Sequence, residues 1–144
     1  MKEHVSQSTS QTAELAAGLA HQILGHTRQS AIVVALEGDL GAGKTTFTQA
    51  FAEALGVSNK VKSPTFNLIK KYSVSGRHLY HIDCYRLKNS DDLKKLGIGE
   101  VLQDPNNIVL IEWAERVEDI LPRNVIRIYF DHLSENSRKI KIDN

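Results

Sequence analysis

The 144-residue sequence has few cysteines and aromatic residues, and neither charge predominates. Its only cysteine, Cys84, excludes an internal disulfide and a multi-cysteine zinc site, and it is expected to be an inert, half-buried thiol in a reducing compartment. Eighteen Lys and Arg against seventeen Asp and Glu leave a formal net charge of +1. No strong overall field would therefore draw the chain to DNA, RNA or a membrane surface.

Long apolar runs are also missing. The longest run, residues 31–36, is far shorter than the roughly 20 residues of a membrane span. The polar start MKEHVSQS is unlike a signal peptide. We therefore expect a cytoplasmic protein that does not associate with membranes, and we expect residues 1–144 to form one domain with a core of its own.

Apolar periodicity in the first half predicts a helix, a strand and a second helix. Ser8 followed by Gln11 is typical of a capping box, and an amphipathic helix pattern follows it. The β-branched run AIVVAL, residues 31–36, predicts a strand that is covered on both faces. After a glycine-rich loop, apolar residues from Phe47 to Leu55 form one stripe of a helix that Gly56 can end.

The second half predicts further strands. NLIKKY (67–72) and HLYHID (78–83) indicate an antiparallel hairpin, and NIVLIEW (107–113) indicates another buried strand. SDDLKKLG predicts a short helix with a Ser90 cap and a Gly97 stop. VIRIYF and KIKI predict a hairpin at the edge of the sheet. The pattern indicates an α/β fold, with a mostly parallel central sheet flanked by helices and extended by antiparallel hairpins.

The stretch EGDLGAGKTT is the strongest chemical signal. Gly38, Gly43, Lys44 and Thr45 satisfy the P-loop pattern G-x-x-x-x-G-K-[ST], between the predicted strand and helix that the motif requires. Glycines allow the backbone amides to surround a phosphate, and the helix N-terminus favours the same anion. Lys44 would neutralise the β- and γ-phosphates, and the Thr45 hydroxyl would bind Mg²⁺. The residues expected around the phosphates are Gly41, Ala42, Gly43, Lys44, Thr45 and Thr46.

Phosphoryl chemistry also needs an acid on a neighbouring strand, and two candidates exist. Glu112 ends the apolar run IVLI, at the edge where ligands lie in open α/β sheets. Asp83 ends HLYHID in the same way. The alternatives are a surface carboxylate for Glu112 and a turn aspartate paired with Arg86 for Asp83.

Other polar and aromatic groups carry weaker signals. Thr65, in the segment Ser-Pro-Thr, either senses the γ-phosphate or belongs to a turn before a strand. Trp113 is expected to pack in the core or at its rim, where it could shape the site or contact a partner. His78 and His81 would point to opposite faces of a strand, which argues against a metal pair.

The missing guanine-reading motif favours ATP over GTP, because neither N-K-x-D nor D-x-x-G occurs. Two other functions remain open from the residues alone. A small-molecule kinase could seat its acceptor near Asp83, although no arginine-rich lid segment is evident. A non-catalytic module could use ATP only to select a conformation for a partner.

Taken in order, GDLGAGKTT, VKSPTF, YHIDCYRL, GIGE and LIEWAERV resemble the TsaE (YjeE) family over nearly the whole chain. The resemblance implies a P-loop ATPase of bacterial tRNA threonylcarbamoyladenosine biosynthesis. Such a protein acts with the partners TsaD and TsaB, which modify adenosine 37 in tRNAs that read codons starting with A. Contact with tRNA would be indirect, and intrinsic ATP turnover would be low.

The same resemblance assigns roles to individual residues. It implies that Lys44 is central to phosphate binding and that Thr45 and Glu112 bind Mg²⁺. Asp83 would orient or activate the attacking water, and Thr65 would respond to the γ-phosphate. Thr12, in the lead helix, would approach the adenine.

Overall fold

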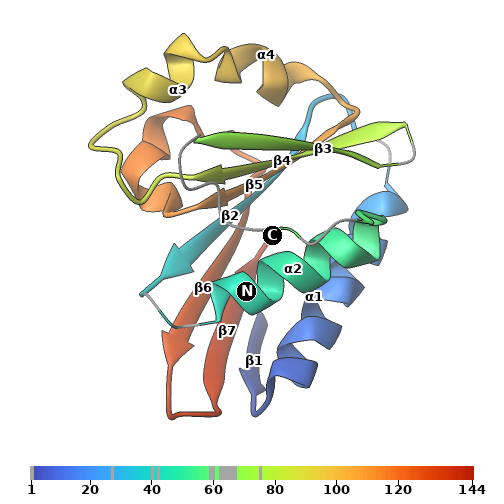
Figure 1. Ribbon diagram of the computed structural model, residues 1–144, viewed down its shortest axis with the longest axis vertical. Helices are drawn as coiled ribbons and strands as arrows, with labels where there is room; N and C mark the ends of the chain where they lie inside the picture. Colours follow the sequence, from blue (N-terminus) through green and yellow to red (C-terminus); the bar gives the residue numbers. More distant parts are fainter. Residues whose placement is uncertain are drawn as a thin grey trace.

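The computed structural model describes residues 2–26, 28–39, 41, 43–58, 61, 68–74 and 76–144. It is a mixed sheet with helices on both faces (Figure 1). In chain order the elements are β1 (Lys2–Ser6), α1 (Thr9–Leu24), β2 (Ile32–Gly38), α2 (Lys44–Leu55), β3 (Ile69–Val74), β4 (Arg77–Asp83), α3 (Asp91–Lys95), α4 (Ile98–Gln103), β5 (Asn107–Glu112), the 3₁₀ segment η1 (Ala114–Ile120), β6 (Ile126–His132) and β7 (Arg138–Asp143).

The seven strands lie in the order β1-β7-β6-β2-β5-β4-β3. The four central strands run parallel, through the pairs β6–β2, β2–β5 and β5–β4. The pairs β1–β7, β6–β7 and β3–β4 are antiparallel. The α/β architecture agrees with the sequence prediction. The parallel centre and its antiparallel extensions also agree with it, although half of all strand pairs are antiparallel and the sheet as a whole is mixed.

Side-chain alternation along the strands divides the core into two layers. In β2, Val34 and Leu36 face the layer that contains α1 and α2. Val33 and Ala35 face the layer built from α3, α4 and η1. Each layer is apolar because strands covered on both faces need hydrophobic side chains in both directions. Figure 1 shows α1 and α2 together on one side of the sheet and α3 and α4 on the other.

The start of α1 and the end of α2 agree with the sequence prediction. Ser8 caps α1, where its Oγ accepts a hydrogen bond from Gln11 N at 3.1 Å. The Gln11 side chain accepts from Gln7 N at 2.7 Å, and not from Ser8 N as an ideal capping box requires. Gly56 ends α2 with a φ of 106°, the left-handed conformation that glycine adopts without strain.

The prediction of an edge hairpin at residues 125–142 is half correct. β6 and β7 pair antiparallel, but β6 lies beside the central strand β2, and β1 covers β7. The sequence did not predict β1, whose residues are mostly polar. An edge strand can be polar because its side chains remain largely in water.

Two local predictions need correction. Ser90 occupies the N-cap position of α3 as predicted, but its hydroxyl makes no bond to the helix and donates to Asp119 Oδ2 at 2.7 Å instead. Cys84 is fully buried rather than half-buried, with none of its surface exposed. Burial raises the pKa of its thiol from 9.0 to about 12.

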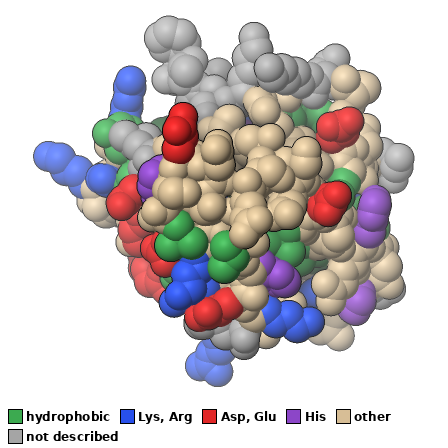
Figure 2. Space-filling view, turned by 90° about the horizontal axis from the view of Figure 1, so that it is seen from below, with side chains coloured by type: hydrophobic (Ala, Val, Ile, Leu, Met, Phe, Trp, Pro, Cys, Tyr) green, Lys and Arg blue, Asp and Glu red, His purple; other side chains and the backbone are tan. Residues whose placement is uncertain are grey.

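Figure 2 shows one face of the molecule, on which acidic and basic side chains are interspersed. Among the helices of the described ranges, none is both long and apolar enough to cross a membrane.

Candidate functional site

The glycine-rich segment links the end of β2 to the start of α2. Gly38 has a φ of 143°, and a Cβ at this position would lie 2.5 Å from the carbonyl oxygen of Phe130. Gly43 is the N-cap of α2, with a φ of 100° and no side-chain cap. The first turn of α2 therefore has amide N–H groups that no capping side chain satisfies, which is the arrangement that binds anions at helix N-termini.

Lys44, the first residue of α2, is only 5% exposed. Its Nζ donates a hydrogen bond to the carbonyl oxygen of Gly38, and it lies 3.8 Å from the centroid of the Trp113 ring. Burial lowers the pKa of the ammonium below its ordinary value of 10.5, and nearby carboxylates, of which Glu112 has the largest effect, oppose that shift. The site thus contains a partly desolvated cation beside the helix N-terminus.

Trp113 connects this lysine to a small aromatic group. The ring of Tyr85 lies 5.0 Å from that of Trp113, centroid to centroid. The Arg116 guanidinium carbon is 5.6 Å from the Trp113 centroid and 5.7 Å from the Tyr85 centroid. Trp113 has a φ of 58°, the only positive φ of a non-glycine residue in the described ranges. A left-handed conformation at a bulky residue is costly and often marks a functional site.

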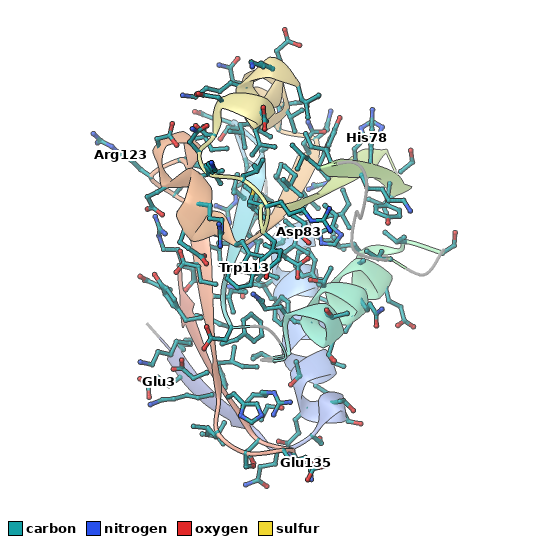
Figure 3. All side chains as sticks on the ribbon, turned by 60° about the vertical axis from the view of Figure 1, so that its left-hand side comes forward. Glu3, His78, Asp83, Trp113, Arg123 and Glu135 are labelled. Carbon is teal, nitrogen blue, oxygen red and sulfur yellow. The ribbon has the colours of Figure 1, made fainter. Side chains whose placement is uncertain are left out.

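Asp83 and Glu112 meet at the same edge of the sheet. They end the parallel strands β4 and β5 and are directly opposite one another in register. Alternation places both side chains on the face that carries α2, together with the buried residues Leu79 and Leu110. Figure 3 shows Asp83 and Trp113 close together near the centre of the molecule, with His78 at the far end of β4. The carboxyl ends of the parallel strands therefore meet the start of α2, as expected for a ligand site.

Glu112 is buried, with 5% of its surface exposed, and it has one side-chain partner among the described residues. His81 Nε2 lies 2.8 Å from Glu112 Oε2. His81 comes from β4, two residues before Asp83, and is 1% exposed. The alternative of a surface carboxylate at Glu112 is wrong, because the side chain lies in the interior.

Asp83 is half-buried, and its Oδ1 accepts a hydrogen bond from Tyr85 N at 3.0 Å. This is an Asx turn, in which a carboxylate bonds the backbone two residues ahead. No ion pair between Asp83 and Arg86 is found among the described residues. The alternative for Asp83, a turn aspartate paired with Arg86, is therefore half correct. The turn is present, and the pairing with Arg86 is not found among the described residues.

A pocket of about 260 Å³ lies beside the start of α2. Thr12 of α1 lines it together with Gly43 and Thr46, so the structure brings Thr12 to the same pocket as two residues of the glycine-rich segment and the start of α2. The Thr12 hydroxyl lies 2.7 Å from Ser6 Oγ and is largely buried. The other residues that line the pocket are Gln7, Ser8, Thr9, Glu135, Asn136 and Arg138.

Sequence reasoning missed Arg138 and the pairing of His81 with Glu112. Arg138 lies against Gly43, and its Nη1 donates to the carbonyl oxygens of residues 134, 135 and 137. No local sequence pattern indicates that Arg138 belongs to the site, because β7 comes near the pocket only through the order of the strands in the folded sheet. His81 had a signal: it shares the parity of Asp83 in HLYHID, and so shares its face.

Two predicted site residues, Ala42 and Thr65, lie outside the described residues. Thr45 and Thr46 are both placed in the first turn of α2, where Thr45 is exposed and Thr46 half-buried. Gly41 is exposed, with a φ of 78°. The roles assigned to these residues remain predictions.

The chemistry of the two predicted metal ligands would suit a Mg²⁺ ion that phosphate and water complete. Glu112 and Thr45 supply hard oxygen atoms, which Mg²⁺ prefers. Among the described residues, no group of three or more His, Cys, Asp or Glu side chains could hold a metal ion by itself. Such sites usually bind Mg²⁺ through one or two carboxylates and substrate phosphates, so a complete protein cage is not required.

Residues 6–140 match the family model described as "Threonylcarbamoyl adenosine biosynthesis protein TsaE". The chain is also similar to proteins called tRNA threonylcarbamoyladenosine biosynthesis protein TsaE. That of Haemophilus influenzae is 40% identical over 117 residues, which is 81% of this chain and 72% of the relative. That of Bacillus subtilis is 44% identical over 108 residues, covering 75% of this chain and 66% of the relative.

Two further comparisons cover almost the whole chain. The TsaE protein of Aquifex aeolicus is 38% identical over 144 residues, which is 99% of this chain and 96% of the relative. The crystal structure of Bacillus subtilis YdiB superposes with a TM-score of 0.77 at 33% identity. That superposition covers 96% of this chain and 82% of YdiB.

Proposed function

The chain belongs to the TsaE family, and on this premise we propose that it is a P-loop ATPase that supports threonylcarbamoyladenosine formation in tRNA. The family and its relatives are named for this biosynthesis. The proposal adds ATP as the nucleotide, Mg²⁺ as the metal, and hydrolysis as the reaction. It also adds TsaD and TsaB as partners, with tRNA contacted only through them.

The observation that carries the proposal is the placement of Lys44. A buried ammonium with a lowered pKa is costly unless an anion compensates it. It lies at the N-terminus of α2, whose first amide groups lack a capping side chain. A triphosphate at this position would supply the missing negative charge and accept those N–H bonds. Lys44 would then exchange the carbonyl of Gly38 for phosphate oxygens.

The carboxylates at the sheet edge support hydrolysis rather than binding alone. Glu112, with the Thr45 hydroxyl, would hold Mg²⁺, which would neutralise charge on the phosphates. Asp83 lies opposite Glu112 in register and would accept a proton from, or orient, a water molecule. The pocket lined by Thr12, Gly43 and Thr46 would accommodate the nucleoside.

Low intrinsic turnover follows from the same residues. An arginine that contacts the transferring phosphoryl group is worth roughly 10³ to 10⁵ in rate. Arg116 is held by the Leu87 carbonyl oxygen, and Arg138 by three loop carbonyls. Both donate to carbonyl oxygens of the protein itself, and we expect a partner to supply the arginine that contacts the phosphoryl group.

The test measures ATP binding by calorimetry and phosphate release, each with and without TsaD and TsaB. We expect Mg²⁺-dependent ATP binding, slow phosphate release alone and faster release with both partners. Lys44→Ala is the control and should lose binding. Absence of ATP binding by well-folded protein would overturn the proposal. Phosphorylation of a metabolite would indicate a small-molecule kinase, and binding without cleavage in every mixture would indicate an ATP-gated module.

A further inference from the structure

The hydrogen bond between His81 and Glu112 lies inside the sheet face that carries α2. The two side chains come from adjacent parallel strands, β4 and β5, and their atoms Nε2 and Oε2 are 2.8 Å apart. His81 is 1% and Glu112 5% exposed. Their neighbours along the same strands, Leu79 and Leu110, are fully buried. The pair thus continues two rows of buried leucine side chains with polar groups.

Fold stability gives little reason for this pair. Backbone hydrogen bonds already join β4 to β5 along the whole register from His78 to Asp83. Replacing both members of a buried polar pair with apolar groups is often neutral or even stabilising. Apolar residues would also continue the pattern of Leu79 and Leu110. The pair therefore has the character of a functional feature.

The bond also has a definite direction. A carboxylate that binds a metal ion only accepts hydrogen bonds, so in the metal-binding state His81 Nε2 would donate to Oε2. No described residue donates to the other oxygen, Oε1, through a side chain. His81 Nδ1 is buried without a hydrogen-bond partner among the described residues. The ring is therefore fixed by its neighbours in the core and by the bond to Glu112.

We propose that His81 is a positioning residue, which holds the Glu112 carboxylate in the orientation that binds Mg²⁺. This inference rests on the proposed role of Glu112 as a metal ligand. By engaging Oε2, His81 restricts rotation of the carboxylate and leaves Oε1 available. Residues that orient a metal ligand in this way typically contribute 10- to 100-fold to metal affinity.

The matched variants are His81→Leu, His81→Gln and His78→Leu. Leucine fills similar space but cannot donate. The glutamine amide nitrogen can reach roughly the position of Nε2 and donate to Glu112. His78 is a control of the same residue type on the same strand; it faces the opposite side of the sheet and makes no side-chain bond to a described residue.

The primary measurement is the affinity of the ADP-bound protein for Mn²⁺, which serves as a probe for Mg²⁺. The electron paramagnetic resonance signal of free Mn²⁺ monitors this binding. We expect His81→Leu to weaken Mn²⁺ binding 10- to 100-fold. His81→Gln should recover most of the loss, and His78→Leu should resemble the parent. Affinity for ADP in excess EDTA should be unchanged in all three variants, because the proposal concerns the metal alone.

Glu112→Gln separates the two proposals. If it abolishes Mn²⁺ binding while His81→Leu binds Mn²⁺ like the parent, the positioning role is wrong and the metal role of Glu112 stands. If Glu112→Gln leaves Mn²⁺ binding unchanged, the proposed metal site itself is wrong. Should His81→Leu fail to fold, His81→Gln and His81→Asn decide, because the shorter asparagine does not reach Oε2. Equal Mn²⁺ affinity in these two would overturn the inference.

Discussion

The Lys44 ammonium lies 3.8 Å from the centroid of the Trp113 ring, while it donates to the carbonyl oxygen of Gly38. The lysine thus has two partners within the protein, an aromatic face and a backbone oxygen. A cation over a tryptophan face is worth about 0.5 to 2 kcal/mol. A polyphosphate offers full negative charge and would draw Nζ away from both partners.

The emission of Trp113 should therefore report nucleotide binding. It is the only tryptophan, so no other indole contributes. We expect its fluorescence to change on addition of ATP as the ammonium leaves the ring. Lys44→Met should show altered emission without nucleotide and no further change with it. The same response to ATP in Lys44→Met and in the parent would contradict this account.

Lys44→Ala should weaken ATP binding by about 2 to 5 kcal/mol, the usual cost of losing one member of a buried charge pair. Fold stability should be retained or raised, because the variant no longer buries an ammonium whose pKa is lowered. Calorimetric titration with ATP and urea unfolding measure the two effects. Parent-like ATP affinity would argue against the proposed phosphate site.

Asp83→Asn should spare ATP binding and lower the hydrolysis rate by about 10² or more, as expected for loss of a general base. The asparagine oxygen can still accept from Tyr85 N, so the turn is preserved. Asp83→Ala, which removes both functions, is the comparison for structural damage. Loss of ATP binding in Asp83→Asn would show that the carboxylate has another role.

Gly38→Ala should destabilise the fold more than Gly41→Ala. The first change places a Cβ 2.5 Å from the Phe130 carbonyl oxygen at a φ of 143°. The second meets no described atom within 4 Å, and its φ of 78° costs only about 1 to 2 kcal/mol. We expect a loss of about 3 kcal/mol for Gly38→Ala, the upper end of the usual cost of overpacking, measured by urea unfolding. Equal losses would mean that the contact with Phe130 relaxes easily.

Ionisation of the Cys84 thiol should lower the free energy of unfolding at alkaline pH. Burial raises the pKa of its thiol from 9.0 to about 12 in the folded state. Below pH 9 the thiol is protonated in both states, so its contribution is fully present. Between pH 9 and about 12 the unfolded chain ionises first, and stability is lost, on the order of 4 kcal/mol in total. Measured by urea unfolding between pH 8 and 10.5, Cys84→Ala should lose less stability than the parent. Equal losses in the two proteins would contradict the raised pKa of Cys84.

The parts of the fold that the sequence predicts are those with strong periodicity. β2, α2 and β5 are apolar runs or stripes, glycines border the first two, and both the type and the order of all three agree with the structure. The hairpin of β3 and β4 also agrees. β1 and the final position of β6 were not predicted, because strand order depends on packing between distant segments. Ser90 could not be assigned correctly, because Asp119, which is distant in sequence, competes for its hydroxyl.

The candidate site was predictable where the motif is continuous in sequence. Lys44 and Thr45 belong to one loop and helix, and Glu112 and Asp83 each end a recognisable strand. The pocket near Thr12 could not be assembled from sequence, because three separate segments form it. The contact between Lys44 and Trp113 also depends on the turn after β5, where the backbone takes a positive φ.

β1 also has a consequence for how the molecule behaves in concentrated solution. It occupies the outer side of β7, with Lys2 opposite Ile142 and Ser6 opposite Arg138. Glu3 of this strand approaches Lys139 and Lys141, at 3.8 and 3.7 Å. A shortened chain without β1 would expose an open row of amides and carbonyls on an Ile- and Lys-rich strand, to which a second copy could add. With β1 in place, the outermost strand is instead one with mostly polar and charged side chains, which disfavour edge-to-edge pairing.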